Sequence, residues 1–137
     1  MLLNGATYQS NLQILGGGVG RNIAEGISKF DKNVHFISVV GNDENGSYLK
    51  RLLRKECRLS LITNQNECTG SYVLILDGKG DCKLIFGNTD INNSITPELI
   101  IKNEKFIKNA PVVVFDANIT RDSMATILDL CRKYNIP

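Results

Sequence analysis

The chain has 137 residues, of which 42% are hydrophobic and 22% are charged, and its formal net charge is +2 at pH 7. These values describe one ordinary globular domain that is long enough to bury a core, and they argue against a nucleic-acid partner. No stretch approaches the roughly 18 apolar residues that a membrane span needs, so we also expect no membrane partner.

The four cysteines form no C-x-x-C pair, and the sequence has one histidine, His35. Because a zinc site needs a cluster of such ligands, we expect no metal site and assign His35 a surface or half-buried packing role. Residues 1–6 lack the basic and long apolar regions of a signal peptide. We therefore expect a cytoplasmic protein with reduced thiols.

Residues 7–15 have mixed polarity, which predicts an exposed strand that leads into the stretch Leu15-Gly16-Gly17-Gly18-Val19-Gly20-Arg21-Asn22-Ile23-Ala24. Apolar residues then recur at helical spacing until about residue 31. The glycines permit positive φ and close approach of a ligand to the backbone. A glycine turn before a helix also presents free N–H groups to phosphate or to sugar hydroxyls. The alternative is a tight strand-to-helix connection without a ligand.

Two common glycine loops do not fit this stretch. The dinucleotide pattern G-x-G-x-x-G, started at Gly16, would need glycine where Arg21 stands. The phosphate loop would need Gly-Lys-Ser or Gly-Lys-Thr, whereas the sequence reads Gly20-Arg21-Asn22.

Further along the chain, β-branched residues predict a buried strand over 34–40, and a helix over about 45–57 and a short strand over 59–63 follow. The stretches 70–76 and 81–86 flank Asp77-Gly78-Lys79-Gly80, which predicts a β-hairpin.

The remaining pattern is a helix that begins with Thr96 as N-cap and Pro97 in its first position, an apolar strand over 111–116, and a helix over 120–134. Alternating strands and helices predict an α/β fold with a parallel sheet that helices cover on both faces.

Two motifs, Gly17-Gly18-Val19-Gly20-Arg21-Asn22-Ile23-Ala24 and Val39-Val40-Gly41-Asn42-Asp43-Glu44-Asn45-Gly46, resemble the ribokinase-like (PfkB) family of carbohydrate and nucleoside kinases. The form Gly-Val-Gly-Arg-Asn is most similar to the pseudouridine kinase branch. The resemblance runs from about Tyr8 to the C-terminus. It implies a partial ribokinase-like sandwich with a mostly parallel sheet, helices on both faces and a small β lid, whose segments are about 7–16 and 68–90. In this family the lid covers the sugar and often forms a homodimer interface.

The resemblance implies that Gly17, Gly18, Asn22, Asp43 and Asn118 bind the substrate. Gly17 and Gly18 match positions whose backbone lies against the sugar, and Asn22 matches an asparagine that binds ring hydroxyls. Asn118 follows a predicted strand, and ligands gather beyond the carboxyl ends of strands in parallel sheets. Helix capping is the alternative for Asn22, and an Asx turn is the alternative for Asp43. Thr69 and Ser71 enter the hairpin where the family's lid approaches the substrate.

Family members carry a Gly-Ala-Gly-Asp segment with the catalytic aspartate, and their ATP and Mg²⁺ contacts, beyond the part that this chain matches. We therefore expect residues 1–137 to be the N-terminal, acceptor-binding half of a kinase domain, with no catalytic residue, no good ATP or Mg²⁺ binding and no activity of its own. Pseudouridine is the favoured acceptor, and adenosine, ribose and fructose phosphate stay open. Two alternatives are a non-catalytic lid and dimerisation module, and an unrelated α/β nucleotide-binding protein.

Overall fold

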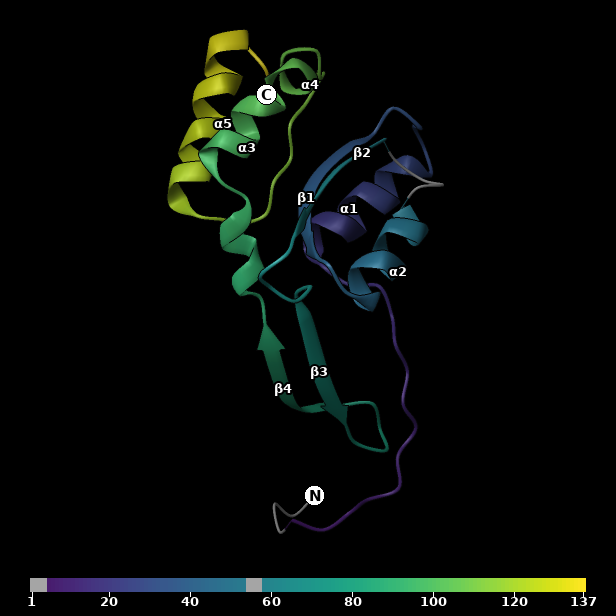
Figure 1. Cartoon of the computed structure of the whole chain (residues 1–137). Helices are drawn as coiled ribbons and strands as arrows, with labels where there is room; N and C mark the ends of the chain where they lie inside the picture. Colours follow the sequence, from purple (N-terminus) through teal and green to yellow (C-terminus); the bar gives the residue numbers. More distant parts are fainter. Residues whose placement is uncertain (1–4, 54–57) are drawn as a thin grey trace.

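The computed structural model describes residues 5–53 and 58–137 (Figure 1). The first half contains α1 (Val19–Ser28), β1 (His35–Gly41), α2 (Glu44–Leu53), β2 (Arg58–Asn64), β3 (Ser71–Leu76) and β4 (Cys82–Asn88). The second half contains the short 3-10 helix η1 (Asp90–Ser94), α3 (Pro97–Lys102), α4 (Glu104–Lys108) and α5 (Arg121–Tyr134). This order confirms the predicted alternation of strands and helices. The end of the predicted helix over 45–57 lies outside the described residues.

Strands β1 and β2 pair in parallel, from His35 opposite Arg58 to Gly41 opposite Asn64. Figure 1 shows α1 and α2 on one side of this pair and α3, α4 and α5 on the other. Because side chains of a strand alternate between its two faces, β1 can contact both groups of helices. Helices therefore cover both faces, as the sequence predicts for an α/β fold.

The main core lies between β1 and the helices of the second half. Val39 packs there with isoleucines and leucines from η1, α3, α4 and α5, and each of these side chains is at most 9% exposed. Burying one such side chain contributes about 1.5–3 kcal/mol. The members of this cluster are Val39, Ile91, Ile95, Leu99, Ile100, Ile107, Ile127 and Leu130.

Helix starts in the second half follow the sequence signals. Thr96 is the N-cap of α3 and its hydroxyl accepts the N–H of Leu99, with Pro97 in the first turn as predicted. Thr120 is likewise the N-cap of α5, and its hydroxyl accepts the N–H of Ser123. The buried Ser123 hydroxyl donates to Ile95 C=O at 2.6 Å. Within the described part of the chain, no helix has the length and apolarity that crossing a membrane requires.

The predicted hairpin is present as the antiparallel pair β3–β4. It extends away from the helical body in Figure 1. Val73 lies opposite Phe86 on one face, and Leu74 lies opposite Ile85 on the other, and all four side chains are more than half exposed. The hairpin therefore carries apolar side chains on both faces.

Two predicted strands are not formed. Residues 7–15 run as an extended segment without strand pairing, and Leu12 and Ile14 are 91% and 81% exposed. Residues 111–116 also pair with no strand, although Val113 N–H donates to Pro137 C=O at 3.0 Å. A strand needs a hydrogen-bonded neighbouring strand along its length, and neither segment pairs with a strand among the residues that the structure describes. The described sheets are accordingly two-stranded, and the parallel sheet is smaller than predicted.

His35 fills a half-buried position, as predicted. Its ring stacks on Phe106 of α4 with 3.7 Å between the ring centroids, and Nε2 forms a 2.8 Å hydrogen bond with the Ser60 hydroxyl of β2. Burial lowers the pKa of His35, and the nearby charges of Arg58 and Lys105 lower it further.

Candidate functional site

The glycine loop before α1 is packed on one side and open on the other. A Cβ on Gly16 would lie 2.8 Å from a methyl group of Leu52, so this residue must stay small unless Leu52 moves. A Cβ on Gly17 would meet no atom within 4 Å. Gly18 has φ of 96° and is the N-cap of α1, a conformation that favours glycine. The loop thus leaves free space in front of Gly17 at the positive end of a helix dipole.

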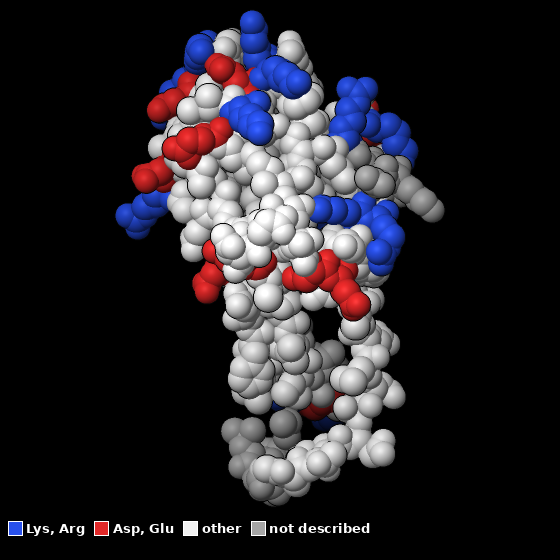
Figure 2. Space-filling view, in the orientation of Figure 1, with Lys and Arg blue, Asp and Glu red and all other residues white. Residues whose placement is uncertain are grey.

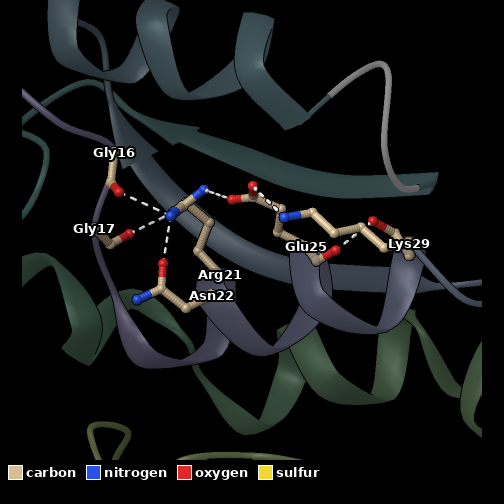
Figure 3. A network of polar contacts seen from close by, with 7 residues as sticks. Gly16, Gly17, Arg21, Asn22, Glu25 and Lys29 are labelled. Atoms are coloured by element: carbon tan, nitrogen blue, oxygen red, sulfur yellow. Dashed lines mark hydrogen bonds and ion pairs between the residues drawn. The ribbon is translucent and has the colours of Figure 1, made fainter.

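Asn22 lies on this open side, one turn into α1. Its backbone N–H donates to Gly18 C=O at 2.9 Å, and its side chain is exposed. The helix has no side-chain N-cap hydrogen bond, so the capping alternative for Asn22 is wrong. The amide of Asn22 is instead held by its neighbour Arg21, whose guanidinium donates to Oδ1 (Figure 3).

The guanidinium of Arg21 joins the loop to the first two turns of α1. Nε donates to Gly17 C=O at 2.8 Å, and Nη2 donates to Gly16 C=O at 2.7 Å. Nη1 forms an ion pair with Glu25 at 2.5 Å, and this hydrogen bond and the arginine charge lower the pKa of the Glu25 carboxyl. The Arg21 side chain is only 12% exposed.

Asp116 brings the loop around Asn118 to the same helix start. Its Oδ2 accepts the N–H of Gly20 at 2.9 Å, and its Oδ1 accepts the N–H of Asn118 at 2.8 Å. A carboxylate at a helix N-terminus is favoured by free N–H groups and by the helix dipole. Sequence reasoning missed this role, although an acid at the end of an apolar run and two residues before Asn118 was a usable signal.

Asp43 belongs to a second cluster, at the end of β1. Its Oδ1 accepts the N–H of Gly46 at 2.7 Å, as in an N-cap of α2, and also accepts the Thr69 hydroxyl at 2.6 Å. Its Oδ2 accepts the N–H of Thr69 at 2.7 Å. These hydrogen bonds, that of the Thr69 hydroxyl first, lower the pKa of Asp43. The structure thus gives Asp43 a local turn role, close to the Asx-turn alternative, and a carboxylate has acceptor capacity beyond these three bonds.

Thr69 connects the segment before the β3–β4 hairpin to this turn. It is 5% exposed, and its hydroxyl accepts the N–H of Gly41 at 2.9 Å. The backbone segments around Thr69 pack closely at two glycines. A Cβ on Gly41 would lie 2.5 Å from Glu67 C=O, and a Cβ on Gly46 would lie 2.4 Å from Gly41 C=O. The second motif therefore fixes the hairpin to the body, while Ser71, the first residue of β3, is exposed.

The structure brings some of the predicted site residues together. Gly17, Gly18 and Asn22 share the start of α1, and Asp116 adds Asn118 to them. Asp43 lines a separate cavity of about 480 Å³ between the end of β1 and α2, together with Asn42, Glu44, Ser47 and Arg51. Figure 2 shows acidic side chains where the helical body meets the hairpin, which disfavours phosphorylated ligands at that junction.

The described residues do not fit a metal site. Within 5–53 and 58–137, no three His, Cys, Asp or Glu side chains lie together in a way that could hold an ion.

The profile of the pfkB family carbohydrate kinases matches residues 3–136. A pseudouridine kinase of Escherichia coli (strain K12) is 32% identical over 124 residues, which cover 82% of this chain and 37% of that protein. A pseudouridine kinase of Arabidopsis thaliana is 26% identical over 139 residues, which cover 98% of this chain and 36% of that protein.

Among solved structures, a carbohydrate kinase from Agrobacterium tumefaciens has a TM-score of 0.87 at 23% sequence identity. The match covers 98% of this chain and 45% of that one, and at this identity it shows the fold alone. The chain spans a little over a third of the length of the two pseudouridine kinases that it matches.

Proposed function

The chain belongs to the pfkB family of carbohydrate kinases, and on that premise we propose that it is the acceptor-binding part of a sugar or nucleoside kinase. PfkB kinases use ATP and a divalent metal to phosphorylate a small-molecule acceptor.

The observation that carries the proposal is the open glycine loop beside Asn22 and Asn118. The free space in front of Gly17 lets a ligand approach the backbone, and the exposed amide of Asn22 lies one turn away. The N–H groups of an amide can donate hydrogen bonds to the hydroxyl oxygens of a ribosyl group. Gly17, Gly18, Asn22 and Asn118 are the proposed acceptor-binding residues, and Asp43 is proposed to border the site.

Pseudouridine is the acceptor that we propose first. The sequence Gly20-Arg21-Asn22 and the 32% identity to a pseudouridine kinase support it. Adenosine and ribose are uncharged competitors, and fructose phosphate is a charged one.

Calorimetric titration of the 137-residue chain with pseudouridine, adenosine, ribose and fructose 6-phosphate tests this proposal. We expect pseudouridine to bind best, and Asn22→Ala to lose roughly 5- to 150-fold in affinity with the lost hydrogen bonds. The matched control is Asn109→Ala, since Asn109 is an exposed asparagine on α4's C-terminal end whose amide donates to Lys105 C=O at 2.7 Å. Equal affinities for Asn22→Ala and the unmodified chain would refute the assignment.

We also propose that the β3–β4 hairpin joins two copies of this chain. Val73 and Phe86 on one face, and Leu74 and Ile85 on the other, expose apolar surface that a single copy leaves uncovered. Sedimentation velocity should show a dimer whose dissociation increases with Val73→Asp or with Leu74→Asp, according to the face that is buried. A monomer at all concentrations would contradict this part of the proposal.

A further inference from the structure

The guanidinium of Arg21 forms its hydrogen bonds with neighbouring residues of the protein. Its guanidinium donates to the carbonyls of Gly16 and Gly17, to Glu25 and to the side-chain oxygen of Asn22 (Figure 3). With 12% of its side chain exposed and Glu25 as its ion-pair partner, it is a poor candidate for direct contact with a ligand. We therefore expect a structural effect of Arg21 on its neighbours in the glycine loop, rather than a contact with the ligand.

The hydrogen bond from Arg21 fixes the orientation of the Asn22 side-chain amide. Because Arg21 has only donors, it can hold the Asn22 side chain only through Oδ1. Figure 3 shows the consequence, since the nitrogen of the Asn22 amide points away from the guanidinium. The two N–H groups of that nitrogen face away from Arg21 and can donate to a ligand.

The same side chain also directs the loop. The carbonyl groups of Gly16 and Gly17 turn toward the guanidinium, at 2.7 and 2.8 Å. Both backbone oxygens therefore already accept a hydrogen bond from Arg21. Glu25 holds the far side of the guanidinium, so the loop, Arg21 and α1 form one connected unit.

We propose that Arg21 is a positioning residue that fixes the amide of Asn22, so that Asn22 binds the acceptor by donating hydrogen bonds from Nδ2 to a hydroxyl oxygen. This inference rests on the proposed function, because it assigns the polarity of a contact in the proposed acceptor site. It assigns Arg21 no contact with the acceptor.

The free chain provides the first test, which needs no ligand. ¹⁵N relaxation of the Asn22 side-chain amide should show restricted motion in the unmodified chain and freer motion in Arg21→Ala. The control is Lys29→Ala, since Lys29 also pairs with Glu25, at 3.6 Å, but lies about two helical turns from Asn22. Equal amide mobility in the unmodified chain and Arg21→Ala would overturn the inference, whether or not pseudouridine binds.

Binding of pseudouridine provides the second test, through the polarity of position 22. Asn22→Asp keeps the size of the side chain and its contact with Arg21 but removes both N–H groups, so we expect the same roughly 5- to 150-fold loss of affinity as for Asn22→Ala. Full affinity in Asn22→Asp would show that the residue accepts rather than donates, and would overturn the inference.

A double-mutant cycle separates positioning from general support of the fold. Arg21→Ala should weaken pseudouridine binding roughly 2- to 10-fold, and should have no further effect in a chain that already carries Asn22→Ala. Additive losses would mean that Arg21 acts independently of Asn22, against the inference. Failure of the unmodified chain to bind any of the four acceptors would instead refute the proposed function and leave the relaxation result to decide the role of Arg21.

Discussion

Replacing Asp43 should destabilise the fold more than replacing an exposed acidic residue does. The carboxylate accepts hydrogen bonds from Gly46 N–H, the Thr69 hydroxyl and Thr69 N–H, at 2.6 to 2.7 Å. Loss of a helix cap costs about 0.5–2 kcal/mol, and leaving a buried N–H without a partner costs about 1–3 kcal/mol. We therefore expect Asp43→Ala to lower the free energy of unfolding by about 3 kcal/mol.

Urea denaturation followed by circular dichroism measures this loss, with Asp81→Ala as the matched control. Asp81 pairs with Lys83 at 3.7 Å and its side chain is 67% exposed, so its removal should change stability by less than about 0.5 kcal/mol. Because the folded state lowers the pKa of Asp43, its stabilisation is present above the ordinary value of 3.8 and is lost as the pH falls through the lowered pKa. A loss below about 1 kcal/mol for Asp43→Ala would refute the reasoning.

Three further predictions concern single residues. Gly46→Ala should lower the free energy of unfolding by about 1–3 kcal/mol, because its Cβ would lie 2.4 Å from Gly41 C=O. Gly17→Ala faces open space and should keep the urea midpoint of the unmodified chain. Equal midpoints for the two variants would contradict this prediction. Asp116→Ala should lower the melting temperature by several degrees and weaken acceptor binding, because Gly20 N–H loses its acceptor; an unchanged melting curve would count against it. The lowered pKa of His35 means that the unfolded state binds a proton more readily, so stability should fall as the pH drops below about 6.5, and this slope should flatten in His35→Asn. Identical slopes in both proteins would exclude His35 as the cause.

The local signals in the sequence predicted the helices and the paired strands well. The Thr96-Pro97 start of α3 and the turn around Asp77 act through near neighbours, so the pattern alone contained the necessary information. The runs at 7–15 and 111–116 failed as strands for the opposite reason. Whether such a segment pairs depends on a distant neighbour, and the pattern of polar and apolar residues says nothing about whether that neighbour is in place.

The candidate site shows the same division. The glycine-rich motif indicated the loop and Asn22, and the positive φ of Gly18 agrees with the reason given for a glycine there. The contact of Asp116 with Gly20 spans 96 residues and could not be read from spacing. The role of Arg21 depends on the conformation of its own side chain, which no sequence pattern specifies.

The proposed acceptor site can be mapped most directly by titrating the ¹⁵N-labelled chain with pseudouridine and following its amide resonances. We expect the largest shifts at Gly17, Gly18, Asn22 and Asn118, and small shifts along α5 beyond its first turn. Saturable shifts confined to α5 or to the hairpin tip, with no shifts in the glycine loop, would contradict the proposal that this loop binds the acceptor.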